Sequence, residues 1–318
     1  MAGLILIEFK RFATIVTGVC AYLMLTLLVF AAMVDQDHSP PDPSISKDIK
    51  IEPVRPRNLL ETVSVRSALA LASLFDAHDY SWPPADENIP SLELIAFPPD
   101  MIDQQVRMKK KLFFAALLPI VLAENERIAQ ERTRIERLLD KGVDRLSEGE
   151  QKLMADLLKR YKAGGEITEV DAQMELLRRT DEIPVALVLA QAANESGWGT
   201  SRFAREGNSL FGQWTFRKST SGLVPDSRSQ DAAHRVRSFE SIRASVRAYL
   251  RNLNVGHAYV ELRKLRAAMR KRGEPLDPLI LATGLKRYSQ RGEAYVEEIK
   301  ALILSNRLQY LVLGQTGS

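Results

Sequence analysis

The fold is decided by the stretch Ala190-Gln-Ala-Ala-Asn-Glu-Ser-Gly-Trp-Gly-Thr-Ser201. Its alanine-rich first half predicts a helix, and its Gly-Trp-Gly elbow predicts that this helix ends directly after Glu195. The C-terminal end of a helix carries partial negative charge, which disfavours ionisation of a nearby carboxyl group. An apolar neighbour such as Trp198 disfavours ionisation further by desolvation. We therefore expect Glu195 to have a raised pKa and to keep a proton near neutral pH.

Further motifs accompany this stretch along the chain. They are Ile183-Pro-Val-Ala-Leu-Val-Leu189 before it, and then Gly207-Asn-Ser-Leu-Phe-Gly-Gln-Trp214, Gly222-Leu-Val-Pro225, Asn252-Leu-Asn254 and Tyr288-Ser-Gln-Arg-Gly292. Together they resemble glycoside hydrolase family 73, the peptidoglycan glucosaminidases of the lysozyme superfamily, and most closely its Bax-type membrane glucosaminidases. The resemblance covers most of residues 180 to 310. The combination of motifs is specific, whereas each short motif alone is not.

This resemblance implies a peptidoglycan hydrolase, an endo-β-N-acetylglucosaminidase that cleaves the glycan bond after N-acetylglucosamine with no metal or other cofactor. Such a reaction uses a protonated carboxyl group to protonate the departing sugar oxygen. Glu195 is the predicted general acid. The alternatives are a lytic transglycosylase on the same fold and a catalytically degenerate module that only binds the cell wall.

The resemblance also suggests the other members of the site. The hydroxyl of Tyr288 is expected to hold the substrate acetamido group or to orient Glu195. Glycine lets a sugar approach the backbone, and aromatic rings stack on apolar sugar faces. The resemblance implies that Asn208 and the Phe-Gly segment contact the N-acetyl group. The predicted substrate-binding residues are Trp198, Asn208, Phe211, Gly212, Gln213 and Trp214, with core packing as the alternative role of the three aromatic side chains.

A partner for Glu195 across the sugar is harder to identify. Family 73 enzymes place an acidic residue in the β lobe, so Asp226 and Asp231 are the candidates by position. Neither lies in a convincing motif, and loop or turn positions are the alternative for both. Without such a partner, the N-acetyl group of the substrate would act as the nucleophile.

Composition excludes several other classes of enzyme. Cys20 is the sole cysteine, so no disulfide within the chain, cysteine nucleophile or Cys-ligated zinc site is expected in the folded domain. The four histidines show no HExxH spacing, which disfavours a zinc amidase. Basic residues outnumber acidic ones by 44 to 40, and many lie between Arg235 and Arg272. Helical periodicity places Arg243, Arg247 and Arg251 opposite the apolar face of their helix. We interpret the basic residues as a solvated helix face, with peptidoglycan as the partner and no nucleic acid.

The N-terminal segment predicts a membrane anchor. Residues 12–34 carry no charge and are numerous enough to span a bilayer as a helix. Lys10 and Arg11 precede this run, so the positive-inside rule places residues 1–11 in the cytoplasm. We expect a single-pass protein of the bacterial inner membrane with a periplasmic catalytic domain. A cleaved signal peptide is the alternative.

The remaining chain divides into three predicted parts. Residues 35–100 form a proline-rich tether and an irregular neck, with a helical stretch over 59–75. Residues 101–165 form a helical region, in which a long helix spans about 103–141 and Ser147-Glu-Gly-Glu150 predicts a capping box. Residues 166–318 form the catalytic domain. The predicted fold is α+β and mostly α: a lysozyme-like helical domain with a small β lobe over 207–237. The sequence does not indicate the oligomeric state.

Overall fold

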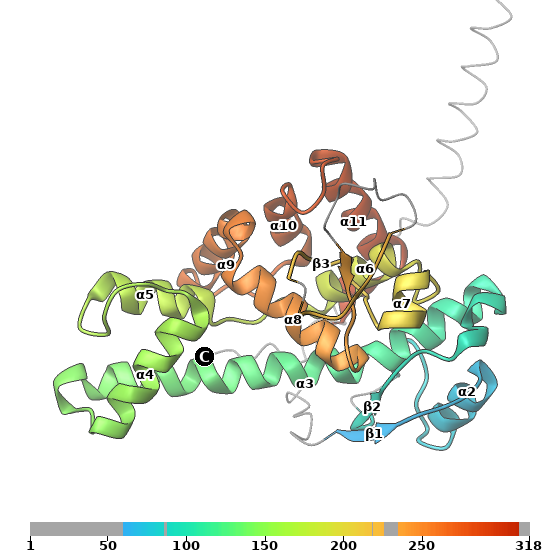
Figure 1. The fold of residues 1–318 in the computed structure, drawn as a ribbon, viewed down its shortest axis with the longest axis horizontal. Helices are drawn as coiled ribbons and strands as arrows, with labels where there is room; N and C mark the ends of the chain where they lie inside the picture. The colour runs from blue at the N-terminus through green and yellow to red at the C-terminus, as the bar shows by residue number, and fades with distance from the viewer. Residues whose placement is uncertain (1–59, 86–87, 218, 226–234, 312–318) are drawn as a thin grey trace, which may run out of the picture. The chain divides into compact units, whose positions relative to one another are not determined.

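The computed structural model describes residues 60–85, 88–217, 219–225 and 235–311. Pro53–Ser318 is one compact unit, and its described part is mostly helical with two small sheets, an α+β architecture (Figure 1). The elements are β1 (Glu61–Val63), α2 (Ala68–Asp76), β2 (Leu92–Leu94), η2 (Pro99–Asp103), α3 (Val106–Lys141), η3 (Val143–Arg145), α4 (Glu148–Tyr161), α5 (Val170–Arg179), α6 (Val185–Ser196), α7 (Arg202–Gly207), β3 (Trp214–Thr215), β4 (Gly222–Leu223), β5 (Arg235–Arg237), α8 (Ile242–Val255), η4 (His257–Tyr259), α9 (Val260–Lys271), α10 (Pro278–Ala282), η5 (Thr283–Leu285), α11 (Glu293–Ser305) and η6 (Leu308–Tyr310).

The predicted transmembrane helix and tether lie outside the described residues. Among the helices that the structure describes, none combines the length and apolar character that crossing a bilayer requires. The segments 101–165 and 166–318 both belong to the one compact unit, and the boundary between them stays a prediction.

Helix α3 connects two hydrophobic cores (Figure 1). Its apolar run over 112–122 is buried in the main core, to which α6, α8 and α11 also contribute. Its second half buries Ile135 and Leu138 in a smaller core with α4 and α5. The predicted capping box is present: the Ser147 side chain accepts a hydrogen bond from the Glu150 backbone, and the Glu150 side chain accepts one from the Ser147 backbone.

The described residues between 60 and 100, which we predicted as an irregular neck, contribute side chains to the main core. Within the helical stretch predicted over 59–75, the helix begins only at Ala68, and Glu61–Val63 is a strand. Strands β1 and β2 pair in parallel, with Val63 opposite Leu94. The ring of Phe97 stacks on that of Phe113 in α3, with centroids 5.2 Å apart. The sequence did not reveal these strands because three residues are too few to display an alternating pattern.

The small β lobe lies within the predicted range. Its strands are antiparallel in the order β3-β5-β4, with Trp214 and Leu223 both paired to Val236. Its connection to α6 runs through the short helix α7, which ends where Asn208 adopts a left-handed conformation with φ 50°. This places the strands directly after the Asn-Ser-Leu-Phe-Gly segment.

Several arginines of α8 and α9 are buried or half-buried, which corrects the interpretation of a solvated face for them, whereas Arg251 and Lys264 are exposed. Glu124 of α3 is fully buried and accepts hydrogen bonds from Arg243 Nε at 2.6 Å and Arg247 Nη2 at 2.7 Å. Arg263 and Arg266 are among the largest fully buried side chains of the described residues. Helical periodicity placed Arg243 and Arg247 opposite the apolar face of their helix but did not show that Glu124 pairs with them.

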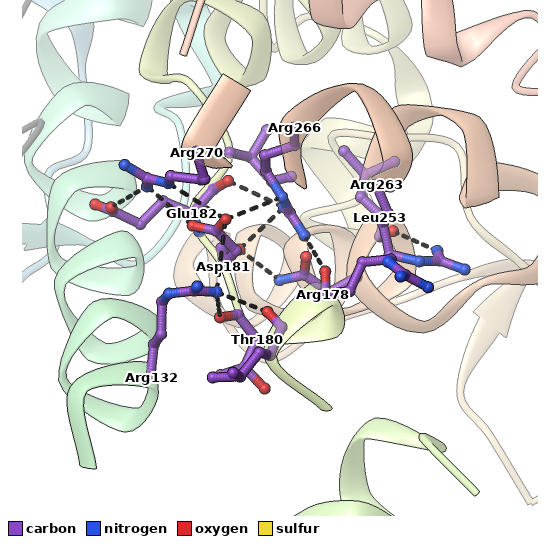
Figure 2. Close-up of polar contacts among 12 residues, drawn as sticks. Arg132, Arg178, Thr180, Asp181, Glu182, Leu253, Arg263, Arg266 and Arg270 are labelled. Atoms are coloured by element: carbon purple, nitrogen blue, oxygen red, sulfur yellow. Dashed lines mark hydrogen bonds and ion pairs between the residues drawn. The ribbon is translucent and has the colours of Figure 1, made fainter. Parts of the chain in front are cut away.

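A second buried ion-pair cluster holds the segment that leads into α6 (Figure 2). Asp181 is nearly inaccessible, and its carboxylate lies 2.9 Å from Arg270 Nη2, 3.5 Å from Arg266 Nε and 3.7 Å from Arg132 Nη1. Arg266 also donates to the backbone carbonyls of Asp181 and Glu182 at 3.1 and 3.0 Å. The cluster thereby joins α3 and α9 to the start of the helix that carries Glu195.

Candidate active site

Glu195 lies in the last turn of α6, and the chain turns sharply after it. Gly197, Trp198 and Gly199 all adopt positive φ angles of 55°, 60° and 77°. A side chain at Gly199 would place its Cβ 2.9 Å from the Phe97 ring, so the packing there excludes a larger residue. The elbow that the sequence predicted therefore ends α6 and holds Glu195 in the last turn of that helix.

The pKa of Glu195 is raised, as the sequence led us to expect. Burial is the largest cause, because it penalises the charged carboxylate. Hydrogen bonds from Tyr295 and Asn194 and the charge of Arg291 act in the opposite direction, while the charge of Glu298 adds to the rise. The net effect favours the protonated acid.

Four tyrosines surround this carboxyl group, and we call Tyr249, Tyr259, Tyr288 and Tyr295 the tyrosine cluster. The rings of Tyr288 and Tyr295 stack with centroids 5.3 Å apart, and Tyr259 and Tyr249 lie 6.0 and 6.5 Å from Tyr288. Burial raises the pKa of all four hydroxyls, and the negative charge of Glu195 raises each further. The hydroxyls therefore stay neutral donors.

A chain of hydrogen bonds orients the hydroxyl that reaches Glu195. Tyr249 donates to Gln191 Oε1, and Gln191 Nε2 donates to the Tyr295 hydroxyl oxygen at 2.8 Å. Since that oxygen already accepts a hydrogen bond, the proton of Tyr295 is available for Glu195, to which it donates. Sequence reasoning missed Gln191, Tyr249, Tyr259 and Tyr295. Gln191 alone carried a local signal, because it precedes Glu195 by one helical turn.

Tyr288 draws the Phe-Gly segment toward the acid. Its hydroxyl donates to the carbonyl oxygen of Phe211 at 2.8 Å, and the Phe211 ring stacks on Tyr249 at 3.8 Å. The next residue, Gly212, has φ 58°, and a Cβ there would lie 3.6 Å from Glu195 Oε2. The structure thus brings together Glu195, Tyr288, Phe211 and Gly212, four residues that the sequence had proposed for one site.

The other predicted binding residues differ in their contacts and exposure. Asn208 donates to the Phe239 carbonyl at 3.3 Å, and its Oδ1, like Gln213 Oε1, is buried without a hydrogen-bond partner among the described residues. Trp214 is 60% exposed. Trp198 packs on α3, with its ring 5.1 Å from Phe114 and 5.8 Å from Phe113.

The two candidates for a second carboxylate, Asp226 and Asp231, lie outside the described residues. Glu298 is a described carboxylate whose charge acts on Glu195, and it forms a 2.6 Å ion pair with Arg291. In the part of the chain that the structure describes, no three His, Cys, Asp or Glu side chains gather closely enough to hold a metal ion. The described groups are those of acid and hydrogen-bond chemistry.

Comparisons with known proteins give the family that the chain resembles. The family model for glucosaminidase, described as mannosyl-glycoprotein endo-β-N-acetylglucosaminidase, matches residues 171–308. Protein Bax of Escherichia coli (strain K12) is 34% identical over 204 residues, which covers 63% of this chain and 70% of Bax. No solved structure matches the chain significantly.

Proposed function

The chain belongs to the family of glucosaminidase-domain proteins that includes protein Bax, and on that premise we propose that it is a peptidoglycan hydrolase. Its reaction is endo-β-N-acetylglucosaminidase cleavage, in which the glycan bond after N-acetylglucosamine is broken and Glu195 is the general acid. The observation that carries the proposal is the raised pKa of Glu195 beside Gly212, which has no side chain to fill the space next to the Glu195 carboxyl group. A protonated carboxyl group in contact with a glycine edge suits donation to a sugar oxygen.

The surrounding groups have defined roles in this proposal. Tyr295 stabilises the carboxylate that forms once Glu195 has given up its proton, because its hydroxyl donates to that carboxyl group. Tyr288 holds the Phe211 carbonyl in place and so positions the glycine edge. The buried acceptors of Asn208 and Gln213 suit the N–H group of the substrate's acetamido substituent.

The group that completes the reaction on the opposite face of the sugar is either a carboxylate or the substrate itself. Asp226 and Asp231 are our candidates for the carboxylate. The substrate's own N-acetyl group is the alternative nucleophile. We further propose that residues 12–34 anchor the protein in the bacterial inner membrane and that the catalytic domain is periplasmic.

Glu195→Gln tests the proposal in the full chain. We expect release of glycan fragments from purified peptidoglycan to fall by about 10²- to 10⁴-fold, since glutamine keeps the shape but cannot donate the proton. Glu206→Gln is the matched control, because this glutamate follows closely in sequence and is half-exposed in an ion pair with Arg202. Equal activity of Glu195→Gln and wild type would refute the role of Glu195.

Mass spectrometry of the products separates the alternative functions. New reducing N-acetylglucosamine ends support the proposed hydrolase. Anhydro-muramyl ends would instead identify a lytic transglycosylase. If the wild-type protein binds peptidoglycan but releases no fragments, the domain is a binding module.

A further inference from the structure

Two large aromatic side chains are exposed on one face of β3 and its continuation. Trp214 and Phe216 are 60% and 69% exposed, whereas Thr215 between them is buried. Successive side chains of an extended segment point to opposite faces, so the two rings share the outer face. Apolar side chains that gather on one exposed face mark a candidate binding surface.

The backbone under these rings is held in place by contacts on its inner side. Thr215 pairs with Arg235 of β5, and its hydroxyl accepts a hydrogen bond from Arg217 N at 3.3 Å. Arg235 Nη2 donates to the Arg217 carbonyl at 2.9 Å. Phe216 therefore lies between two anchored residues, and its ring projects from a fixed stretch of chain.

The exposed rings continue the edge that begins at the acid. Gly212 lies against Glu195, and the chain leaves it toward Trp214. Phe216 follows Gly212 by four residues, and a chain that advances about 3.3 Å per residue separates the two by at most about 13 Å. That reach exceeds the length of one sugar ring, so the two exposed rings are within reach of sugars that neighbour the cleaved pair.

We propose that Trp214 and Phe216 form a distal subsite, which binds sugar rings of the glycan strand at least one ring away from the bond at Glu195. The proposal rests on the proposed function, and it adds that the enzyme binds part of the glycan strand beyond the cleaved bond. Pyranose rings in a β-linked strand present apolar C–H faces, and aromatic rings bind such faces by stacking. The subsite makes the enzyme prefer long strands over short oligosaccharides.

The test compares Phe216→Ala and Trp214→Ala in the full chain on peptidoglycan glycans of defined length. We expect the ratio of kcat/KM on long strands to kcat/KM on the shortest cleaved oligosaccharide to fall about five- to tenfold. Tyr310→Ala is the matched control, because Tyr310 is 75% exposed in η6, far along the chain from the β lobe. It should leave the ratio at the wild-type value.

Binding provides a readout that does not need cleavage. In a Glu195→Gln background, Phe216→Ala should weaken sedimentation with purified peptidoglycan, and Tyr310→Ala should not. If both aromatic variants cleave and bind every length as the wild type does, the subsite is refuted while the proposed function stands. If the wild type cleaves no glycan but the aromatic variants lose peptidoglycan binding, the hydrolase proposal fails and the sugar-binding surface remains. Retained glycan binding with loss of a protein partner would assign the surface to that partner and overturn the inference.

Discussion

Helix α6 has an acidic side chain near each end, buried Asp181 before its start and half-buried Glu195 in its last turn, and the two have different partners. Burial alone would raise the pKa of both Asp181 and Glu195. Around Asp181 the charges of Arg266, Arg270 and Arg132 outweigh burial and lower its pKa. The hydrogen-bond donors to Glu195 are neutral, the Tyr295 hydroxyl and the Asn194 amide, and its pKa stays raised. Asp181 becomes a fixed charge because three arginines together outweigh its burial, whereas Glu195 keeps a proton because no comparable set of positive charges opposes its burial.

Removing the charge of Asp181 should have the largest effect on stability. Asp181→Asn leaves Arg132, Arg266 and Arg270 without the carboxylate that they share, and we expect the free energy of unfolding to fall by about 3–5 kcal/mol. Urea unfolding at pH 7 measures this. Glu261→Gln is the control, because Glu261 and Lys264 are exposed and 3.9 Å apart, and such pairs contribute about 0–1 kcal/mol. Equal losses in the two variants would show that the buried charges do not stabilise this end of α6.

Glu182, the neighbour of Asp181 in the same cluster, shows a case in which burial outweighs an arginine partner. Burial raises its pKa to about 7 although Arg270 lies 3.0 Å away. The folded protein therefore binds a proton that the unfolded chain releases at lower pH. The resulting stability is present below about pH 4.5 and is lost as the pH rises to about 7. The wild-type protein should lose about 1–3 kcal/mol of its free energy of unfolding between pH 5 and pH 8 through Glu182. Glu182→Gln cannot titrate, so this part of the pH dependence should be absent from the variant. Unfolding curves at the two pH values measure it, and an unchanged pH dependence would contradict it.

Tyr295→Phe should have the smallest effect and should act on Glu195 itself. The Tyr295 hydroxyl lowers the pKa of Glu195, so its removal leaves burial less opposed and the pKa should rise. Glu195 then stays protonated to a higher pH, and the alkaline limb of the pH–rate profile should shift to higher pH by about half to one unit. Tyr310→Phe, an exposed tyrosine, is the control. A shift to lower pH would mean that Tyr295 does not stabilise the carboxylate.

The sequence predicted the parts of the site that depend on neighbouring residues. The end of α6 at Glu195 follows from the glycine elbow, and the placement of Gly212 and Tyr288 follows from motifs that resemble a known family. The tyrosine cluster did not follow, because its contacts join residues far apart: Gln191 lies 104 positions from Tyr295 and 58 from Tyr249. No local spacing records such pairings.

The arginines show the same limit for the fold. Periodicity correctly placed Arg243 and Arg247 on the face of α8 opposite its apolar residues. The exposure of that face depends on Glu124 of α3, which pairs with both arginines although it lies more than a hundred positions earlier in the chain. The helix was therefore predictable from its own residues, whereas its polar neighbours were not.

The shared core of α3 and α6 has a practical consequence for anyone who wishes to isolate the glucosaminidase domain. The family model begins at residue 171, yet Asn125 of α3 binds both the carbonyl and the amide of Ile183 at 2.7 and 3.2 Å. Trimming the gene to the matched region would delete this clamp and the phenylalanines that support the glycine elbow. An expression fragment that retains the active geometry must therefore start before α3, well upstream of the segment that homology marks.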